Sequence, residues 1–285
     1  MKMKKDEVKK HVRARYAAAA TAGSSCCGPA PCCGTQTGPD KERESLAVGY
    51  SAEDLSGVPA ESNLGLGCGN PAALAGLKEG ETVLDLGAGA GIDCFLAARK
   101  VGPTGRVIGV DMTPQMIDRA RENVRKSGAA NIEFRLGEIE SLPAADASID
   151  VIISNCVINL SPEKDRVFRE AFRVLKPGGR LLVSDIVLSR PLPKALQESA
   201  AVYTACVAGA MLRDDYLKEI EAAGFRRVEI VSETAFPAEA ILTSAQASQV
   251  VRELKVSRRE LESAVGSVLS LSVRAVKEGS GTGLA

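Results

Sequence analysis

An acidic residue and three alternating glycines follow an apolar run in Thr82–Gly91, TVLDLGAGAG. Such a run, followed by glycines and a helical pattern, is typical of a strand, a tight turn and a helix that bind a nucleotide. Asp85 lies near the end of this predicted strand, residues 82–86, where a carboxylate would repel a pyrophosphate but attract the ammonium group of a cationic amino-acid ligand. S-adenosylmethionine is such a ligand, so we expect this segment to bind it. The alternative is an ordinary nucleotide fold in which Asp85 is structural.

A second acid, Asp111, ends the next predicted strand, residues 105–110. A carboxylate at this position accepts two hydrogen bonds from ribose hydroxyls in dinucleotide-binding folds. The loop of residues 137–140 follows the third predicted strand, residues 132–136, and is placed to contact an adenine ring.

Four cysteines lie beside these segments. Cys68 precedes the first strand, Cys94 lies in the first turn of the helix after the glycines, and Cys156 and Cys206 follow the fourth and fifth strands. The carboxyl ends of parallel strands form one crevice, so we expect the thiols to lie near the cofactor. Each could be a small buried hydrophobe. Four near one crevice favour a thiolate site for a soft electrophilic centre, and the helix N-terminus should give Cys94 thiolate character.

The other four cysteines lie in residues 21–45, among Gly, Pro, Ser and Thr. They are Cys26, Cys27, Cys32 and Cys33. This segment is expected to be mobile, because it cannot form a packed core. The two adjacent pairs could gather a soft metal ion or could be exposed thiols, and no histidine supports a zinc site. The single histidine, His11, lies in a predicted helix and should be exposed, so histidine-based catalysis is not expected.

The elements that would position these residues alternate between strand and helix from Thr82 onward, which predicts a parallel sheet covered on both faces. Further strands are expected at 149–154, 180–187, 227–232 and 269–276. Helices are expected at 2–20, 114–126, from a Ser161 cap to Lys176, and around 193–223, while 237–266 cannot be placed. We expect three parts: 1–45, the cofactor-binding 46–190, and 191–285 with the remaining strands.

The formal net charge of zero argues against a nucleic-acid or membrane-surface partner. Basic residues concentrate in the first fifteen positions, but Asp6 and Glu7 interrupt them, which favours a solvated helix. No apolar stretch is long enough for a bilayer, so we expect a cytoplasmic monomer with a small-molecule substrate.

Six sequence motifs make a family resemblance specific. They are GLGCGNP, LDLGAGAGIDCF, GVDMTPQMI, GEIESLP, SNCVINL and the segment around Cys206. Across residues 60–235 the chain resembles the arsenite methyltransferases, which methylate trivalent arsenic with S-adenosylmethionine. SNCVINL with the matching cysteines is far more specific than the glycine motif.

The resemblance implies an α/β fold, the Rossmann-like class I methyltransferase, with a seven-stranded, mostly parallel sheet, helices on both faces and a C-terminal extension. It implies that Cys156 and Cys206 bind the arsenical, with Cys94 as a further ligand. Cys68 and Cys94 would complete the thiol set and exchange disulfides, which an external thiol such as glutathione or thioredoxin would reduce. The implied cofactor pocket consists of Asp85, Gly87, Gly89, Asp111, Met112, Glu138, Ile139 and Asn155.

Three alternatives stay open. A methyltransferase of the same fold could act on an organic small molecule, with structural cysteines. A metalloid-sequestering protein would leave Asp85 and Asp111 without a role. A redox sensor on a nucleotide fold would lack a CxxC pair.

Overall fold

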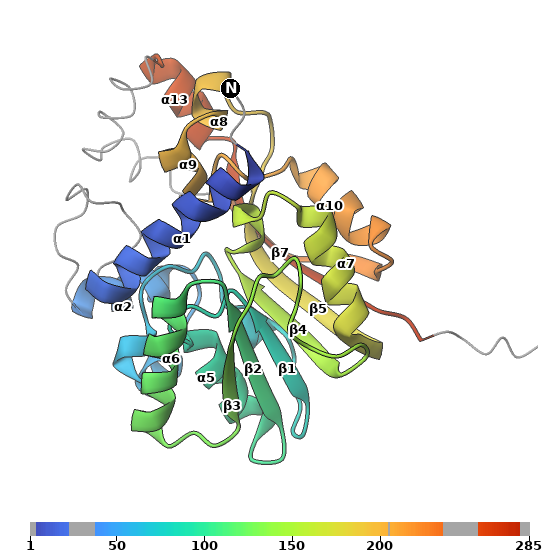
Figure 1. Cartoon of the computed structure of the whole chain (residues 1–285). Coiled ribbons are helices and arrows are strands. Elements are labelled where there is room, and N and C mark those ends of the chain that lie inside the picture. Colours follow the sequence, from blue (N-terminus) through green and yellow to red (C-terminus); the bar gives the residue numbers. More distant parts are fainter. Residues whose placement is uncertain (1–3, 23–37, 205, 236–255, 280–285) are drawn as a thin grey trace, which may run out of the picture.

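The computed structural model describes residues 4–22, 38–204, 206–235 and 256–279. Within them, a seven-stranded sheet has the order β3-β2-β1-β4-β5-β7-β6 (Figure 1). β7 is antiparallel to both of its neighbours, and the other neighbouring strands are parallel. This confirms the predicted Rossmann-like, mostly parallel sheet. The strands are β1 (Thr82–Leu86), β2 (Arg106–Asp111), β3 (Ile132–Leu136), β4 (Ile149–Asn155), β5 (Leu175–Leu188), β6 (Arg226–Ala235) and β7 (Val268–Val276).

Helices cover both faces of this sheet, as Figure 1 shows. The longer ones are α1 (Lys5–Ala22), α2 (Gly38–Ala47), α5 (Ile92–Val101), α6 (Pro114–Ser127), α7 (Lys164–Val174), α10 (Arg213–Ala222) and α13 (Arg258–Val265). The short ones are α3 (Ala52–Ser56), α4 (Pro71–Leu74), α8 (Lys194–Gln197), α9 (Ala200–Thr204), and the 3₁₀ turns η1 (Ala60–Ser62) and η2 (Ile158–Leu160). Among the described residues, no helix combines the length and the apolar composition needed to cross a membrane.

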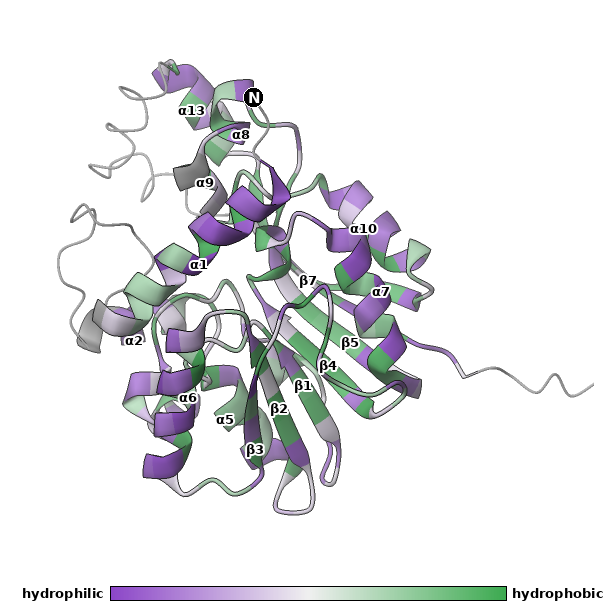
Figure 2. Cartoon of the chain, viewed as in Figure 1, coloured by the Kyte–Doolittle hydropathy of each residue, from purple (hydrophilic) through white to green (hydrophobic). Residues whose placement is uncertain are grey.

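The central strands are apolar on both faces because both are covered. Successive residues of a strand point to opposite faces, so Leu84 packs in one core with Phe168 of α7, whereas Val83 packs in the other with Phe95 of α5. Figure 2 shows this hydrophobic colour along β1, β4 and β5. The carboxyl end of β1, where Asp85 lies, therefore packs between two hydrophobic cores, one on each face of the sheet.

A close approach between β2 and β3 requires a glycine. A Cβ at Gly109 would lie 2.5 Å from the ring of Phe134 and 2.8 Å from Cβ of Ala88. We expect Gly109→Ala to lower the free energy of unfolding by about 1–3 kcal/mol, measured by urea denaturation. Gly279→Ala is the matched control, because a Cβ there would lie 3.8 Å from Cβ of Pro177, an ordinary contact, and the backbone of Gly279 is not left-handed. Equal stability of Gly109→Ala and wild type would contradict this account.

The helix before β5 begins later than predicted. Ser161 was expected to cap it, but α7 begins at Lys164 after Glu163. The Ser161 hydroxyl instead donates a 2.6 Å hydrogen bond to Oε1 of Glu140, and it accepts one from the backbone N–H of Glu163. The helix ends at Val174 rather than Lys176, because Leu175 already begins β5.

The sequence predicted one helical segment around 193–223, but the structure divides this range into separate helices. Three helices, α8, α9 and α10, occupy it. Between α9 and α10, a Cβ at Gly209 would lie 2.2 Å from the carbonyl oxygen of Asn159, so the chain passes close to η2 there instead of continuing a helix. Of the unplaced residues 237–266, the structure describes only 256 onward, which contain α13.

The charge pattern of the N-terminal helix predicted that it is solvated, but α1 is exposed to solvent on only part of its surface. One side of α1 is buried, with Val8 4% and Val12 1% exposed, and the helix contacts α6, α9 and η2. His11 is exposed, as expected. Figure 2 shows the hydrophilic colour along its first turns. Part of the segment 21–45 is ordered as α2, whereas its four cysteines lie outside the described residues.

Candidate active site

The glycine turn after β1 adopts backbone conformations that suit glycine. Gly87, Gly89 and Gly91 have φ values of +69°, +53° and +100°. The turn brings the N–H of Gly89 to 3.0 Å from Oδ2 of Asp111, and the N–H of Thr113 lies 2.8 Å from Oδ1. These bonds fix the Asp111 carboxylate. Burial raises the pKa of this carboxyl, and the hydrogen bonds from Thr113 and Gly89 oppose the rise.

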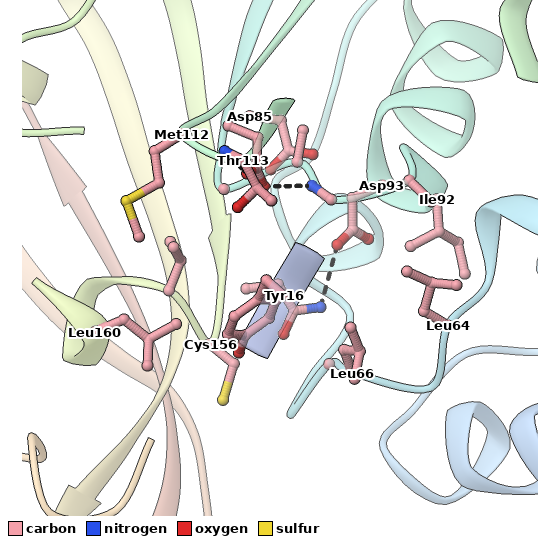
Figure 3. Close-up of a pocket in the computed structure, with 18 of the residues that line it drawn as sticks. Tyr16, Leu64, Leu66, Asp85, Ile92, Asp93, Met112, Thr113, Cys156 and Leu160 are labelled. Carbon is pink, nitrogen blue, oxygen red and sulfur yellow. Dashed lines mark hydrogen bonds between the residues drawn. The ribbon is translucent and has the colours of Figure 1, made fainter. Parts of the chain in front are cut away.

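A pocket that is open to solvent begins at this turn (Figure 3). Seven of the eight predicted cofactor residues line it, namely Asp85, Gly87, Gly89, Asp111, Met112, Ile139 and Asn155. Glu138 is not among the lining residues. Its carboxylate is instead bound by α1, with Lys9 Nζ at 2.8 Å and Arg13 Nη2 at 3.1 Å.

Side chains of α1 also line the pocket, which sequence reasoning missed. They are Lys9, Val12 and Tyr16. The ammonium group of Lys9 lies 3.3 Å from Oε1 of the buried Glu140. Burial opposes the charge of Lys9, but the hydrogen bond to Glu138 and the charge of Glu140 outweigh it and raise the Lys9 pKa. Only the spacing of Val8 and Val12 in the sequence signalled a buried side of this helix.

Asn155 connects the pocket to the loop that carries Cys68. Its Nδ2 donates to the carbonyl oxygen of Gly69 at 2.8 Å and to Oδ2 of Asp93 at 3.1 Å, while its Oδ1 accepts from the N–H of Cys68 at 3.0 Å. The Tyr50 hydroxyl donates to Oδ1 of Asp93 at 2.9 Å. Burial raises the pKa of Asp93 to about 6. Tyr50 and Asp93 also line the pocket, and nothing in the sequence pattern singled them out.

Three of the four predicted thiols lie together, and we call Cys68, Cys156 and Cys206 the thiol cluster. The Cys206 thiol donates to the carbonyl oxygen of Cys156 at 3.2 Å, and the Cys68 thiol donates to that of Ser184 at 3.4 Å. All three are buried in one apolar cluster, and none is in a disulfide.

The thiol cluster adjoins this pocket, because Cys156 lines it (Figure 3). Cys156 and Cys206 both have positive φ values, +57° and +63°. Side chains other than glycine rarely adopt this conformation, and such residues concentrate at functional sites. Burial raises the pKa of the Cys68 thiol, so this group is neutral at pH 7 in the free protein.

Cys94 lies apart from the cluster. Its side chain is fully buried, and its thiol donates to Oδ2 of Asp85 at 3.2 Å. The expectation that the helix N-terminus gives Cys94 thiolate character is wrong. Burial and the charge of Asp85 raise the pKa of this thiol well above its ordinary value, because both disfavour the thiolate.

Comparisons with known proteins point to the methyltransferases. Residues 77–224 match the family model described as a methyltransferase domain. An arsenite methyltransferase from Halobacterium salinarum is 53% identical over 79% of this chain and 59% of its own length. The human arsenite methyltransferase is 40% identical over 48% of this chain and 38% of its own length. The chain thus spans only part of the length of these curated relatives.

A solved structure extends the likeness to three dimensions. The arsenic(III) S-adenosylmethionine methyltransferase from Chlamydomonas reinhardtii is 33% identical, with a TM-score of 0.62 over 85% of this chain and 74% of that one. The family model, the sequence identities and the three-dimensional likeness therefore agree, and this chain belongs to the arsenite methyltransferase family of S-adenosylmethionine-dependent methyltransferases.

Proposed function

We propose that this chain transfers a methyl group from S-adenosylmethionine to trivalent arsenic, in arsenite or methylated arsenicals, held by cysteine thiolates. The observation that carries the proposal is the position of Cys156, which belongs to the thiol cluster and also lines the cofactor pocket. A substrate bound by the cluster would therefore lie next to the cofactor. Organic acceptors need no such cluster.

The residues of the pocket fit the cofactor. Asp111, fixed by two backbone N–H groups, has lone pairs left for ribose hydroxyls, and Asp85 supplies a carboxylate for an ammonium group. Met112 and Ile139 offer apolar contact for an aromatic ring. When bound, S-adenosylmethionine supplies an electrophilic methyl group on a sulfonium. The chain has to hold this group in line with the nucleophile, and orientation of this kind is worth about 7–11 kcal/mol.

The thiol cluster fits the substrate. Trivalent arsenic on three thiolates is pyramidal and keeps a lone pair, so no base has to remove a proton from the nucleophile. The geometry favours Cys68 as the third arsenic ligand beside Cys156 and Cys206, because its sulfur atom lies within 4.8 Å of that of Cys156. The Cys94 thiol is instead hydrogen-bonded to Asp85. A role for Cys94 would then be confined to disulfide exchange.

A reduction completes the cycle. Arsenic becomes formally pentavalent when its lone pair takes the methyl group, and two electrons return it to the trivalent state. Two cysteines supply these electrons by forming a disulfide, which an external thiol such as glutathione or thioredoxin then reduces. The four described cysteines are free thiols, which suits the reducing cytoplasm. We propose that the chain acts as a monomer, since the described residues of the pocket and of the thiol cluster supply every protein group that this mechanism needs.

The experiment is methyl transfer from labelled S-adenosylmethionine to arsenite with excess thiol. We expect methylated arsenic whose formation depends on both arsenite and thiol. If cofactor binds but arsenite is never methylated, the fold assignment stands and the substrate is an organic small molecule. If no cofactor binds, the cluster serves metalloid sequestration instead.

The contact between α1 and Glu138 yields a separate prediction. Lys9→Met removes the ammonium group that pairs with Glu138 and Glu140, so α1 should cover the pocket less firmly, and cofactor affinity should fall roughly 3- to 10-fold. Isothermal titration calorimetry measures this. Lys5→Met is the matched control on the same helix, since Lys5 pairs with Glu163 at the exposed surface. Equal losses in both variants would contradict a specific role for Lys9.

A further inference from the structure

A buried carboxylate lies beside the thiol cluster, and the proposed methylation does not use it. A carboxylate oxygen of Asp185 and the sulfur atoms of Cys68 and Cys156 all lie within 4.8 Å of one another. They come from three segments: the loop before β1, the end of β4, and β5. Asp185 is 1% exposed in the mostly apolar residues 181–188 of β5, and an acid in such a position is costly to bury.

The carboxylate is held in one orientation. Its Oδ1 accepts hydrogen bonds from Asn159 Nδ2 at 2.9 Å and from the N–H of Ile186 at 3.1 Å, and Oδ2 accepts one from the Tyr216 hydroxyl at 3.2 Å. A carboxylate has about four lone-pair sites, so acceptor capacity remains for a ligand. Metal-binding carboxylates are oriented by hydrogen bonds in the same way.

Charge and ligand number distinguish what this site could hold. Trivalent arsenic is neutral with three thiolates and needs no further donor. A thiophilic divalent cation such as Zn²⁺ or Cd²⁺ prefers four ligands in a tetrahedron, drawn from Cys, His, Asp and Glu. The ammonium group of Lys164, whose charge acts on Asp185, would offset part of the negative charge that four anionic ligands bring.

The geometry points to a second ligand for this site: a thiophilic divalent cation bound by Cys68, Cys156 and Asp185. The Cys206 thiol, which donates to the carbonyl oxygen of Cys156 beside these three groups, would turn in as the fourth donor. The three thiols release their protons to solvent when the cation binds, and so does the protonated fraction of Asp185, whose pKa burial raises to about 7. The cation and trivalent arsenic would use the same sulfur atoms and exclude each other. This competition rests on the proposed arsenic site, whereas cation binding itself does not.

The test compares the two ligands in the full chain with Cys26, Cys27, Cys32 and Cys33 replaced by serine, so that only the four described cysteines remain. CdCl₂ is titrated into the reduced protein and followed by the thiolate-to-cadmium charge-transfer absorption. Arsenite is titrated separately by calorimetry. We expect one bound Cd²⁺ that arsenite displaces.

Asp185→Asn decides the role of the carboxylate. It keeps an acceptor oxygen for the N–H of Ile186 but removes the charge, so Cd²⁺ affinity should fall about 10- to 100-fold while arsenite affinity stays within about threefold. Cys94→Ser is the control for a buried thiol outside the cluster and should leave Cd²⁺ affinity unchanged. Unchanged Cd²⁺ affinity in Asp185→Asn, or an equal loss of both ligands, would overturn the proposal.

A measurement without the Asp185 substitution covers the case in which this variant does not fold. Zinc K-edge X-ray absorption of the four-serine chain loaded with Zn²⁺ should show a first shell of three sulfur atoms and one oxygen. A shell of four sulfur atoms, or no bound Zn²⁺, would refute the carboxylate ligand. Failure of arsenite methylation with a mixed sulfur and oxygen shell would count against the proposed function alone.

Discussion

Replacing Cys156 or Cys206 by serine is expected to lower the rate of arsenite methylation by at least about 100-fold, because a site with two thiolates no longer fixes the arsenic lone pair toward the methyl group. Serine is matched in size, and like cysteine it must adopt φ values near +57° and +63° at these positions, so the substitutions test the sulfur atom rather than the backbone. Labelled methyl transfer to arsenite with excess thiol measures the rate.

Cofactor affinity separates loss of the ligand from loss of the fold. Cys206 does not line the cofactor pocket, so Cys206→Ser should bind S-adenosylmethionine as wild type does. Cys94→Ser is the informative companion. A first turnover at the wild-type rate, followed by arrest, would place Cys94 in disulfide exchange. Normal turnover in both Cys156→Ser and Cys206→Ser would refute thiolate-bound arsenic and favour an organic acceptor.

The sheet and its cofactor edge could be predicted from the sequence because local signals were strong. The apolar run around Asp85 and the glycines after it specify β1 and its turn, and Asp111 follows from the same logic one strand later. The glycines at positive φ confirm the turn. These features depend on neighbours in sequence, which a periodicity analysis reads directly.

Contacts between distant segments could not be predicted in this way. Nothing in the polar pattern of α1 shows that Lys9 reaches Glu138, which is 129 positions away. The grouping of the cysteines was predicted, but Cys94 faces Asp85 because α5 turns its first residues toward β1. The position of Cys94 at the start of a helix did not reveal that its side chain is buried. This burial raises the pKa of the thiol, whereas the sequence predicted a thiolate.

Asp185 had a signal that was overlooked. It is an acid within LLVSDIVL, a run otherwise suited to a strand buried on both faces. Because an unpaired buried carboxylate is unfavourable, such a residue indicates either a satisfied hydrogen-bond network or a ligand. Asp185 has such a hydrogen-bond network, and the neighbouring thiols of Cys68 and Cys156 make it a candidate metal ligand as well.

The second large effect is expected at Asp111. Asp111→Ala should weaken S-adenosylmethionine binding about 100-fold or more, because it removes an acceptor for two ribose hydroxyls, and each hydrogen bond to a charged group is worth about 1.5–3 kcal/mol. It also frees the N–H groups of Gly89 and Thr113. Calorimetry of cofactor binding measures the change. Asp118→Ala, at an exposed position of α6, is the control and should bind normally.

Asp111→Asn separates the two roles of this carboxylate. The amide keeps one acceptor oxygen, so it can hold the N–H of either Gly89 or Thr113 but not both, and its NH₂ group cannot accept from a ribose hydroxyl. We therefore expect an affinity between those of wild type and Asp111→Ala. If Asp111→Asn binds as weakly as Asp111→Ala, the charge dominates; if Asp111→Ala itself binds like wild type, the ribose is held elsewhere. The intermediate result would mean that the turn after β1 and the cofactor depend on the same two oxygens.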